Sequence, residues 1–238
     1  MRSEPPAAGR QKLVILGTGG TCRDILDTVL DLNAAEGKTG FECIGFLDDD
    51  RALWGTEVQG VPVLGPLSSA AGMADCVFVN GIGSPGNFQR KAAIIAGTGL
   101  PLDRFATLVH PTASVSRSAQ LGRGVVIFQH VTVTTNVRIG DHVTILPNTV
   151  ISHDDWIGDY TSIAGGVCIS GGVRVGRSCY LGTGSTLKPG IVIGDGSLVG
   201  MGSVVLHTVE PDCVVVGNPA RLLRRASLGA VIDPHVRA

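Results

Sequence analysis

The stretch VTTNVRIGDHVTILPNTVISHDDWI, residues 133–157, decides the fold, because an aliphatic side chain returns in it at every sixth position. The same register runs from Val109 to Val205 without an insertion, which makes seventeen consecutive positions occupied by Val, Ile or Leu. A period of six fits neither an α-helix nor a strand that alternates between two faces. It predicts a solenoid of short strands, in which three faces give eighteen residues per coil.

The composition fits such narrow coils. Glycine accounts for 34 of 238 residues, about twice its ordinary usage, and aromatic residues for only 4%. The core must therefore be packed with small and β-branched side chains. In seven repeats a glycine follows the aliphatic residue directly: Gly122, Gly140, Gly158, Gly176, Gly182, Gly194 and Gly200.

The first hundred residues follow a different pattern. Apolar strands are predicted over 12–16, 41–47 and 75–80, helices over 23–35 and 87–96, and a short last strand over 104–109. Strands that alternate with helices and end in glycines predict a Rossmann-like α/β unit. We expect a flexible lead-in at 1–11, this unit at 12–108, the solenoid at 109–225 with a cap at its end, and a tail at 226–238.

Charge and composition exclude several classes of protein. The net charge is −1, and the only basic cluster is Arg221, Arg224 and Arg225, so we expect no nucleic-acid partner. No apolar run approaches the roughly 18 residues that span a membrane, and the N-terminus has no secretory signal pattern. The six cysteines form no CxxC pair. They are expected to be buried free thiols of a cytoplasmic protein.

Three predicted loops follow strands of the α/β unit and converge on the edge where open sheets bind ligands. The first has Gly17, Gly19 and Gly20, whose backbone N–H groups could hold a phosphate, but its sixth position is Cys22 and the dinucleotide fingerprint is incomplete. A tight turn is the alternative. The other loops offer side chains for a nucleotide or, alternatively, a solvated turn and helix face: Asp48 and Asp49 in the second, Gly83, Asn87, Arg90 and Lys91 in the third.

His153, followed by Asp154, is the candidate general base of the solenoid. Residues eighteen apart stack on adjacent coils, roughly 4.8 Å from each other, so His153 should lie beside Gly171. The imidazole would take a proton, the carboxylate would fix its tautomer, and the Gly171 N–H could polarise a carbonyl. A surface histidine on a turn is the alternative. His130, His142 and His207 give no convergent set with it, so no metal site is predicted.

The layout as a whole resembles the hexapeptide-repeat sugar O/N-acetyltransferases. These enzymes acetylate sialic acids or the amino group of nucleotide-linked aminosugars of the bacillosamine and perosamine type. The resemblance covers about residues 12–225. It is carried by Gly-Thr-Gly-Gly before Arg-Asp-Ile-Leu-Asp, by Leu-Asp-Asp-Asp, Gly-Ile-Gly and His110-Pro111, by His153-Asp154, and by Gly217-Asn218-Pro219-Ala220-Arg221. It implies a left-handed parallel β-helix.

The resemblance also implies roles. His153 would be the base and Asp154 its orienting carboxylate, and the Gly171 amide would bind the thioester carbonyl. Acetyl-CoA would lie along the solenoid between subunits of a homotrimer, with Ser162, Met201 and Arg221 among its contacts. The loops with Asp48, Asp49 and Gly83 would hold the nucleotide. Two positions depart from the family pattern, because Thr21 and Ser162 stand where the family usually has histidine.

The function expected from these features is acetyl transfer from acetyl-CoA to the amine of a nucleotide-linked 4-amino-4,6-dideoxy sugar, without an acyl-enzyme. One alternative is O-acetylation of a sugar of the sialic-acid type. A second is a non-catalytic trimeric scaffold that binds a nucleotide.

Overall fold

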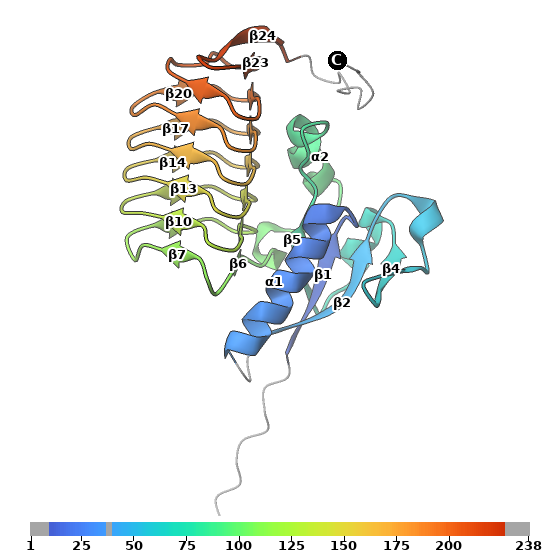
Figure 1. Cartoon of the computed structure of the whole chain (residues 1–238). Helices are drawn as coiled ribbons and strands as arrows, with labels where there is room; N and C mark the ends of the chain where they lie inside the picture. Colours follow the sequence, from blue (N-terminus) through green and yellow to red (C-terminus); the bar gives the residue numbers. More distant parts are fainter. Residues whose placement is uncertain (1–9, 37–39, 227–238) are drawn as a thin grey trace, which may run out of the picture.

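The computed structural model describes residues 10–36 and 40–226. Figure 1 shows a small α/β domain beside a tall solenoid whose coils stack from β7 to β24. Most of the predicted lead-in, residues 1–9, and nearly all of the predicted tail, residues 227–238, lie outside the described residues. Gln11, the last residue of the predicted lead-in, already belongs to the first strand.

The N-terminal domain is built on a five-stranded sheet with the strand order β3-β4-β2-β1-β5. Pairing is parallel except between β3 and β4, so the order reverses at β1, between β2 and β5. Helix α1, Gly20–Glu36, packs its apolar side on the sheet through Ile25, Leu26 and Val29. The strands are β1 (Gln11–Leu16), β2 (Phe41–Leu47), β3 (Glu57–Val58), β4 (Val61–Gly65) and β5 (Cys76–Asn80).

Short helices complete this domain. Helix α2, Lys91–Ala96, follows the third loop, and the 3₁₀ helices among the described residues are η1 (Arg51–Leu53), η2 (Leu67–Gly72), η3 (Phe88–Arg90) and η4 (Leu102–Arg104). The predicted strand at 104–109 is wrong over most of its length. Arg104 instead ends η4 and donates from its guanidinium to the carbonyls of Met73 and Cys76. Phe105 forms an isolated parallel bridge with Phe78, and within this range only Leu108–Val109 is a strand, which pairs with the solenoid.

The solenoid is a left-handed parallel β-helix of two-residue strands, as predicted. Each strand ends on one of the seventeen periodic aliphatic residues. The strands are β6 (Leu108–Val109), β7 (Ser114–Val115), β8 (Gln120–Leu121), β9 (Val126–Ile127), β10 (Thr132–Val133), β11 (Arg138–Ile139), β12 (Thr144–Ile145), β13 (Val150–Ile151), β14 (Trp156–Ile157), β15 (Ser162–Ile163), β16 (Cys168–Ile169), β17 (Arg174–Val175), β18 (Tyr180–Leu181), β19 (Thr186–Leu187), β20 (Val192–Ile193), β21 (Leu198–Val199) and β22 (Val204–Val205).

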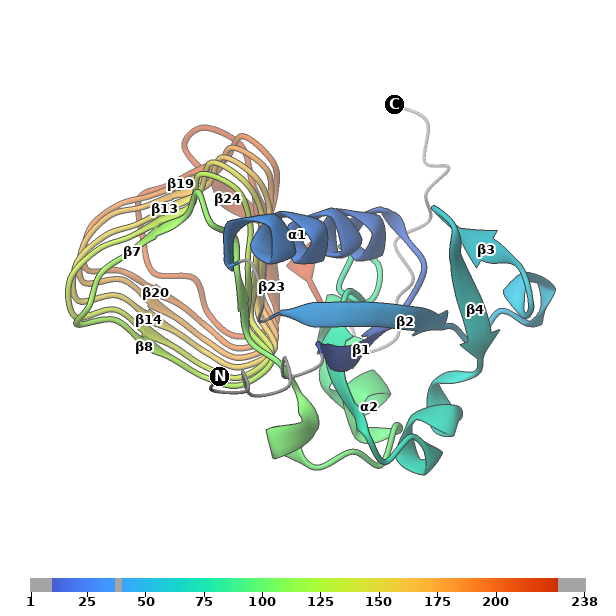
Figure 2. The same cartoon turned by 90° about the horizontal axis from the view of Figure 1, so that it is seen from below.

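Three sheets form the walls of the solenoid, and Figure 2 shows them around its axis. We name them in the order in which each coil passes through them. The first face holds β6, β9, β12, β15, β18, β21 and the cap strands β23 (Cys213–Val216) and β24 (Arg221–Arg225). The second face holds β7, β10, β13, β16, β19 and β22, and the third face holds β8, β11, β14, β17 and β20.

The turns between the faces repeat one backbone conformation. At every sixth residue from Gly124 to Gly202 the φ angle is positive, between 49° and 74°. Glycine occupies about half of these positions and Asn or Asp several others, the residues that adopt this conformation at least cost. Asp154 is one of them, with φ 63°. The repeated turn conformation therefore determines the backbone position of Asp154 and of its neighbour His153.

The N-terminal domain packs against the first face (Figures 1 and 2). Val126, Phe128 and Leu146 of the solenoid join the core cluster of α1 and β1. A polar contact at the domain boundary reinforces the packing, since the Nε2 of the buried His110 lies 2.9 Å from Oδ2 of the exposed Asp31. The two domains are thus held in one orientation, which sets the relation between their candidate sites.

The six cysteines differ in their exposure. No described cysteine is in a disulfide, but Cys168 is exposed on the second face and Cys43 is only half-buried, so the prediction that all thiols are buried is wrong. Cys168 points outward because it occupies the strand position before the buried Ile169.

Among the described helices, none has the length and apolar character needed to cross a bilayer.

Candidate active site

His153 and Asp154 lie at the edge between the second and third faces, in the turn from β13 to β14. The His153 Nδ1 is 2.8 Å from Asp154 Oδ2, and both side chains are exposed, at 66% and 59%. A carboxylate at Nδ1 favours the tautomer with its proton on that nitrogen. The Nε2 atom is then a free acceptor directed away from Asp154, which is the form of imidazole that a general base needs.

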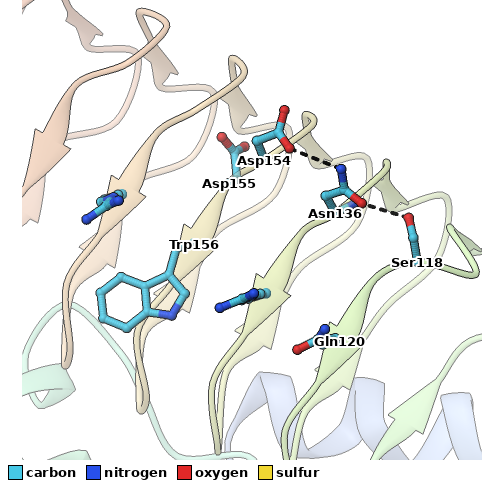
Figure 3. Close-up of a pocket in the computed structure, with 8 residues that line it drawn as sticks. Ser118, Gln120, Asn136, Asp154, Asp155 and Trp156 are labelled. Atoms are coloured by element: carbon cyan, nitrogen blue, oxygen red, sulfur yellow. Dashed lines mark hydrogen bonds between the residues drawn. The ribbon is translucent and has the colours of Figure 1, made fainter.

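Asp154 is held in place from the previous coil. Asn136 Nδ2 donates to Asp154 Oδ1 at 3.2 Å, and the Asn136 N–H donates to Ser118 Oγ at 3.0 Å, as Figure 3 shows. The hydrogen bond with His153 first, and then that from Asn136, keep the pKa of Asp154 below its usual value. The carboxylate is therefore charged at neutral pH and can support a protonated imidazole.

Gly171 lies directly beside the His153 ring, as the eighteen-residue spacing predicts. A Cβ atom on Gly171 would stand 2.5 Å from the ring carbon Cε1 and 2.6 Å from Nε2, so only glycine fits there without moving the ring. The Gly171 carbonyl accepts from Gly190, but its N–H donates to no acceptor in the described part of the chain. An unoccupied N–H next to a general base is suited to an oxyanion.

The other histidines have different surroundings. His142 is buried, stacks on Tyr160 at 5.3 Å and meets Phe105 edge-on at 4.5 Å. Burial lowers the pKa of His142 to about 4, so its ring is neutral. His130 and His207 are exposed on the solenoid. The described residues contain no group of three or more His, Cys, Asp or Glu side chains that could hold a metal ion.

A second candidate site is the pocket between the N-terminal domain and the first face, with a volume of about 530 Å³. It opens at the strand-order reversal beside β1, where open α/β sheets bind ligands. The three predicted loops do converge there. Gly17, Gly19, Gly20, Asp48, Asp49, Gly83 and Asn87 all line the pocket, together with Arg90 and, from the solenoid, Thr144, Leu146, Ser162, Ala164 and Tyr180.

The acidic loop is ordered by its own hydrogen bonds. Thr18 donates to Asp48 Oδ2 at 2.7 Å and thereby joins the first loop to the second. The other Asp48 oxygen accepts from the Asp50 N–H, and Asp49 Oδ1 accepts from the Leu67 N–H. Thr18 was not among the predicted site residues. Only the fold reveals its role, because Asp48 is thirty residues away.

The glycines of the pocket have two different roles. Gly17 has φ +95°, and a Cβ there would meet Cys22 and Ile82 at 2.9 Å, so this glycine is required by packing. A Cβ on Gly19 or Gly20 would meet nothing within 4 Å. These two residues therefore leave open space at the N-terminus of α1, where backbone N–H groups and the helix dipole favour an anion.

Lys91 does not have the exposed position that a residue in contact with the ligand would need. Its side chain is fully buried, and its Nζ donates to Thr144 Oγ1 at 3.0 Å and to Ser162 Oγ at 3.3 Å. Burial lowers the pKa of Lys91 to about 7. Lys91 thus stands behind the pocket wall and joins α2 to the first face, and the solvated helix face considered for it is excluded.

The three remaining predicted residues lie away from His153. Ser162 is buried on the first face, in the wall of the pocket. Met201 is 81% exposed in the turn between the first and second faces, and Arg221 is exposed at the start of β24. The edge that carries His153 and Gly171 is a different one. In a single chain, the structure does not bring the two sets together.

A third hollow, of about 580 Å³, lies on the third face next to Asp154 (Figure 3). Trp156 stands in its centre, 46% exposed, between Arg138 of the previous coil and Arg174 of the next. Asp155 lines it as well, although it is itself buried. The sequence analysis did not predict the group of Arg138, Trp156 and Arg174. These residues are eighteen apart, so the six-residue repeat could have revealed that they stack on adjacent coils.

The solenoid and the histidine at its edge place the chain in the class of hexapeptide-repeat transferases. Comparison with protein families agrees with this class. Residues 172–207 match the bacterial transferase hexapeptide model of six repeats, and residues 12–94 match the PglD N-terminal domain model. Together the two models match half of the chain. No curated protein is similar enough to the chain to count as a match.

Several solved structures are similar over nearly the whole chain. The acetyltransferase domain of PglB from Neisseria gonorrhoeae FA1090, in complex with acetyl coenzyme A, is 28% identical with a TM-score of 0.76, covering 90% of this chain and 100% of that domain. PerB from Caulobacter crescentus, in complex with CoA and GDP-perosamine, is 28% identical with a TM-score of 0.73, covering 88% and 96%. WeeI from Acinetobacter baumannii AYE is 27% identical with a TM-score of 0.74, covering 89% and 99%.

The chain therefore combines an N-terminal domain of the PglD type with hexapeptide repeats, and over most of its length it is similar to solved acetyltransferases with the same two domains. It is an enzyme of the acyltransferase class. The predicted combination of a Rossmann-like domain with a left-handed β-helix is confirmed.

Proposed function

We propose that this chain transfers the acetyl group of acetyl-CoA to the amino group of a nucleotide-linked 4-amino-4,6-dideoxy sugar. The observation that carries the proposal is the exposed His153–Asp154 pair beside the free N–H of Gly171. The relatives support the choice of substrates, because one is solved with acetyl coenzyme A and another with CoA and GDP-perosamine.

The chemistry follows from the tautomer of His153. The sugar amine attacks the thioester carbonyl carbon, and His153 Nε2 takes a proton from the amine nitrogen as the carbon–nitrogen bond forms. Asp154 stabilises the resulting imidazolium. The tetrahedral intermediate then collapses, the carbon–sulfur bond breaks, and the imidazolium returns the proton to the thiolate of CoA. Protons and charges balance without a covalent enzyme intermediate.

Gly171 would stabilise the intermediate. When the amine adds to the thioester, negative charge moves onto the carbonyl oxygen, and a fixed N–H aimed at that oxygen lowers the barrier. The Gly171 N–H has no competing acceptor in the described chain, and Gly171 itself lies directly beside the His153 ring. One small residue therefore supplies both the donor and the space for the imidazole.

The pocket between the domains would hold the nucleotide of the acceptor. Its open glycines at the start of α1 suit a diphosphate, Arg90 adds a positive charge, and Asp48 and Asp49 offer acceptors for hydroxyl or amide protons. The solenoid wall of the pocket contributes Ser162 and Tyr180. This division assigns the acceptor to the N-terminal domain and the thioester to the solenoid.

The base and the pocket must then come from different subunits. The pocket lies on the first face, whereas His153 stands on the edge between the other two faces, so a ligand in one chain's pocket cannot reach the same chain's base. A cyclic trimer with the second faces inward solves this, because His153 of each protomer then approaches the neighbour's first face. Within the strands of the second face, the outward residues carry no charge: Ser114, Thr132, Val150, Cys168, Thr186 and Val204.

The trimer also accounts for the divided acetyl-CoA residues. Ser162, Met201 and Arg221 lie on or near the first face of one protomer, and His153 and Gly171 of the neighbour would form the opposite wall. The cofactor would lie in the groove between them. We expect light scattering to give three times the chain mass of 24.5 kDa, and a stable, fully active monomer would refute the arrangement.

Asp48→Ala tests the division of labour between the domains. Loss of the carboxylate breaks the bond from Thr18, and we expect the KM for the nucleotide sugar to rise about tenfold, as for one charge-assisted hydrogen bond. The KM for acetyl-CoA should stay within about twofold. Steady-state kinetics measure both.

A matched control for Asp48→Ala is Asp50→Ala. Asp50 caps η1 through its bond from the Ala52 N–H and does not line the pocket, so it should leave both constants near their wild-type values. Equal changes in both constants for Asp48→Ala would contradict the division.

The function itself is tested by acetyl-CoA consumption with UDP-, GDP- and dTDP-linked aminosugars. We expect turnover with one nucleotide and a product acetylated on nitrogen, identified by its mass and by resistance to mild base. Acetylation of a hydroxyl would favour the sialic-acid type of reaction. No turnover with any acceptor, despite binding of a nucleotide, would favour a non-catalytic scaffold.

A further inference from the structure

Asp155, the residue after the His153–Asp154 pair, is a buried carboxyl group with one oxygen unaccounted for. Only 1% of the residue is exposed. Its Oδ1 accepts from the Val173 N–H on the next coil at 2.8 Å. Its Oδ2 is also buried but has no partner in the described part of the chain. Buried carboxylates are normally paired or fully hydrogen-bonded, so this arrangement needs a reason.

The position of Asp155 connects it to the proposed catalytic turn on two sides. Along the chain it follows Asp154 directly. Across the coils it holds the backbone of Val173, which is two residues from Gly171. One side chain therefore links the turn that carries the base to the turn that carries the proposed oxyanion donor.

The charged groups around Asp155 come from three coils. His153 and Asp154 belong to its own turn, and Arg138 and Arg174 line the same hollow from the previous and the next coil. Burial raises the pKa of Asp155 to about 7, while the N–H groups of Val173 and Ser152 and the nearby His153 oppose this rise and Asp154 adds to it. Asp155 is thus neutral in mildly acidic solution and charged in mildly basic solution.

We infer that Asp155 is a positioning residue for the His153–Asp154 pair: its carboxyl group ties the catalytic turn to the coil of Gly171, and its charge strengthens His153 as a base. This inference rests on the proposed function of His153. When Asp155 is ionised, a second negative charge stands near the imidazole and stabilises its protonated form. When Asp155 is protonated, that support is absent and only Asp154 remains.

Asp155→Asn tests the inference, because asparagine keeps the oxygen that accepts from Val173 and mimics the protonated acid. We expect turnover of the variant to match the wild type near pH 6 and to fall about three- to tenfold below it near pH 8.5. The KM values for both substrates should not change. A purely structural role would lower turnover by the same factor at every pH.

Two variants serve as references in the same assay. Asp195→Asn is the matched control, because Asp195 also accepts a backbone N–H from another coil, that of Arg177 at 2.8 Å, but is exposed and distant from His153. The inference would be overturned if the turnover of Asp155→Asn relative to the wild type did not change with pH, or if Asp195→Asn showed the same change. In either case an inactive His153→Ala would leave the proposed function standing. A fully active His153→Ala would overturn both.

A measurement on the wild type keeps the test independent of folding of the variant. At pH 6 the protonated Asp155 should give an infrared carbonyl band of a carboxylic acid, and this band should vanish by pH 8.5. Thermal unfolding adds a check with a defined sign. Between about pH 4 and pH 7 the folded state still holds this proton, whereas the unfolded state has lost it. The contribution of Asp155 to the free energy of unfolding therefore decreases as the pH rises from about 4 to 7. Absence of the infrared band would refute the inference.

Discussion

His153→Ala should lower the turnover number by roughly 10²–10⁴, the usual contribution of a positioned acid–base group. Among the described residues, the ring is the group at this edge that is placed both to accept the amine proton and to be stabilised by Asp154. The KM for acetyl-CoA should change little, since the imidazole contributes proton transfer rather than affinity. Steady-state kinetics with one accepted aminosugar measure both quantities.

Two companion variants make this prediction specific. Asp154→Asn should cost less than His153→Ala, because the amide still positions the ring but no longer stabilises its positive charge. His207→Ala is the control, since His207 is an exposed histidine three coils away in the same column of the solenoid. It should keep wild-type turnover.

The pH dependence separates His153 from the alternative account, in which the amine arrives already deprotonated. In that account the alanine variant would recover near-normal turnover at pH 8–9, where more of the amine is neutral. The site geometry predicts that the defect persists there, because the proton that must leave is the one lost as the new bond forms. Wild-type turnover of His153→Ala at neutral pH would remove the residue from the mechanism.

The solenoid could be predicted from sequence because one physical constraint repeats in it. Each strand must bury one aliphatic residue, and each turn needs a residue that tolerates positive φ, so the period of six defines both. The same register predicts that His153 lies beside Gly171, because these residues are one coil of eighteen residues apart. It also contains the Asn136–Asp154 bond, since these residues are eighteen apart.

The contacts that could not be predicted from sequence depend on how distant segments and the two domains pack together. Nothing in the local sequence of Lys91 indicates that α2 turns this side chain toward Thr144 and Ser162. The bond from Thr18 to Asp48 joins two loops whose distance only the sheet defines. Similarly, the strand predicted at 104–109 is interrupted, since Arg104 ends η4 and its guanidinium binds backbone carbonyls of a distant segment.

Burial was the property least accessible from sequence. Asp154 and Asp155 are identical and adjacent residues, yet one is exposed and bound to His153 while the other is buried under the turn. Cys168 was expected inside and lies outside. In both cases a shift of one residue along a two-residue strand or its turn exchanges the inner for the outer position.

Mixed trimers test the central claim most directly, namely that the base of one protomer serves the pocket of its neighbour. One variant is His153→Ala. The other is Gly19→Phe, which should fill the pocket without disturbing the fold, because a Cβ at Gly19 meets nothing within 4 Å and its φ is not positive. Each variant alone should be nearly inactive.

The two variants are co-expressed with different tags, and trimers that carry both tags are purified and assayed for acetyl transfer. In a cyclic trimer of either mixed composition, one site in three combines an intact base with an intact pocket, so the account predicts about one third of the wild-type activity. If base and pocket belonged to the same chain, no intact site would form. Mixed trimers as inactive as the two parent variants would contradict the shared site.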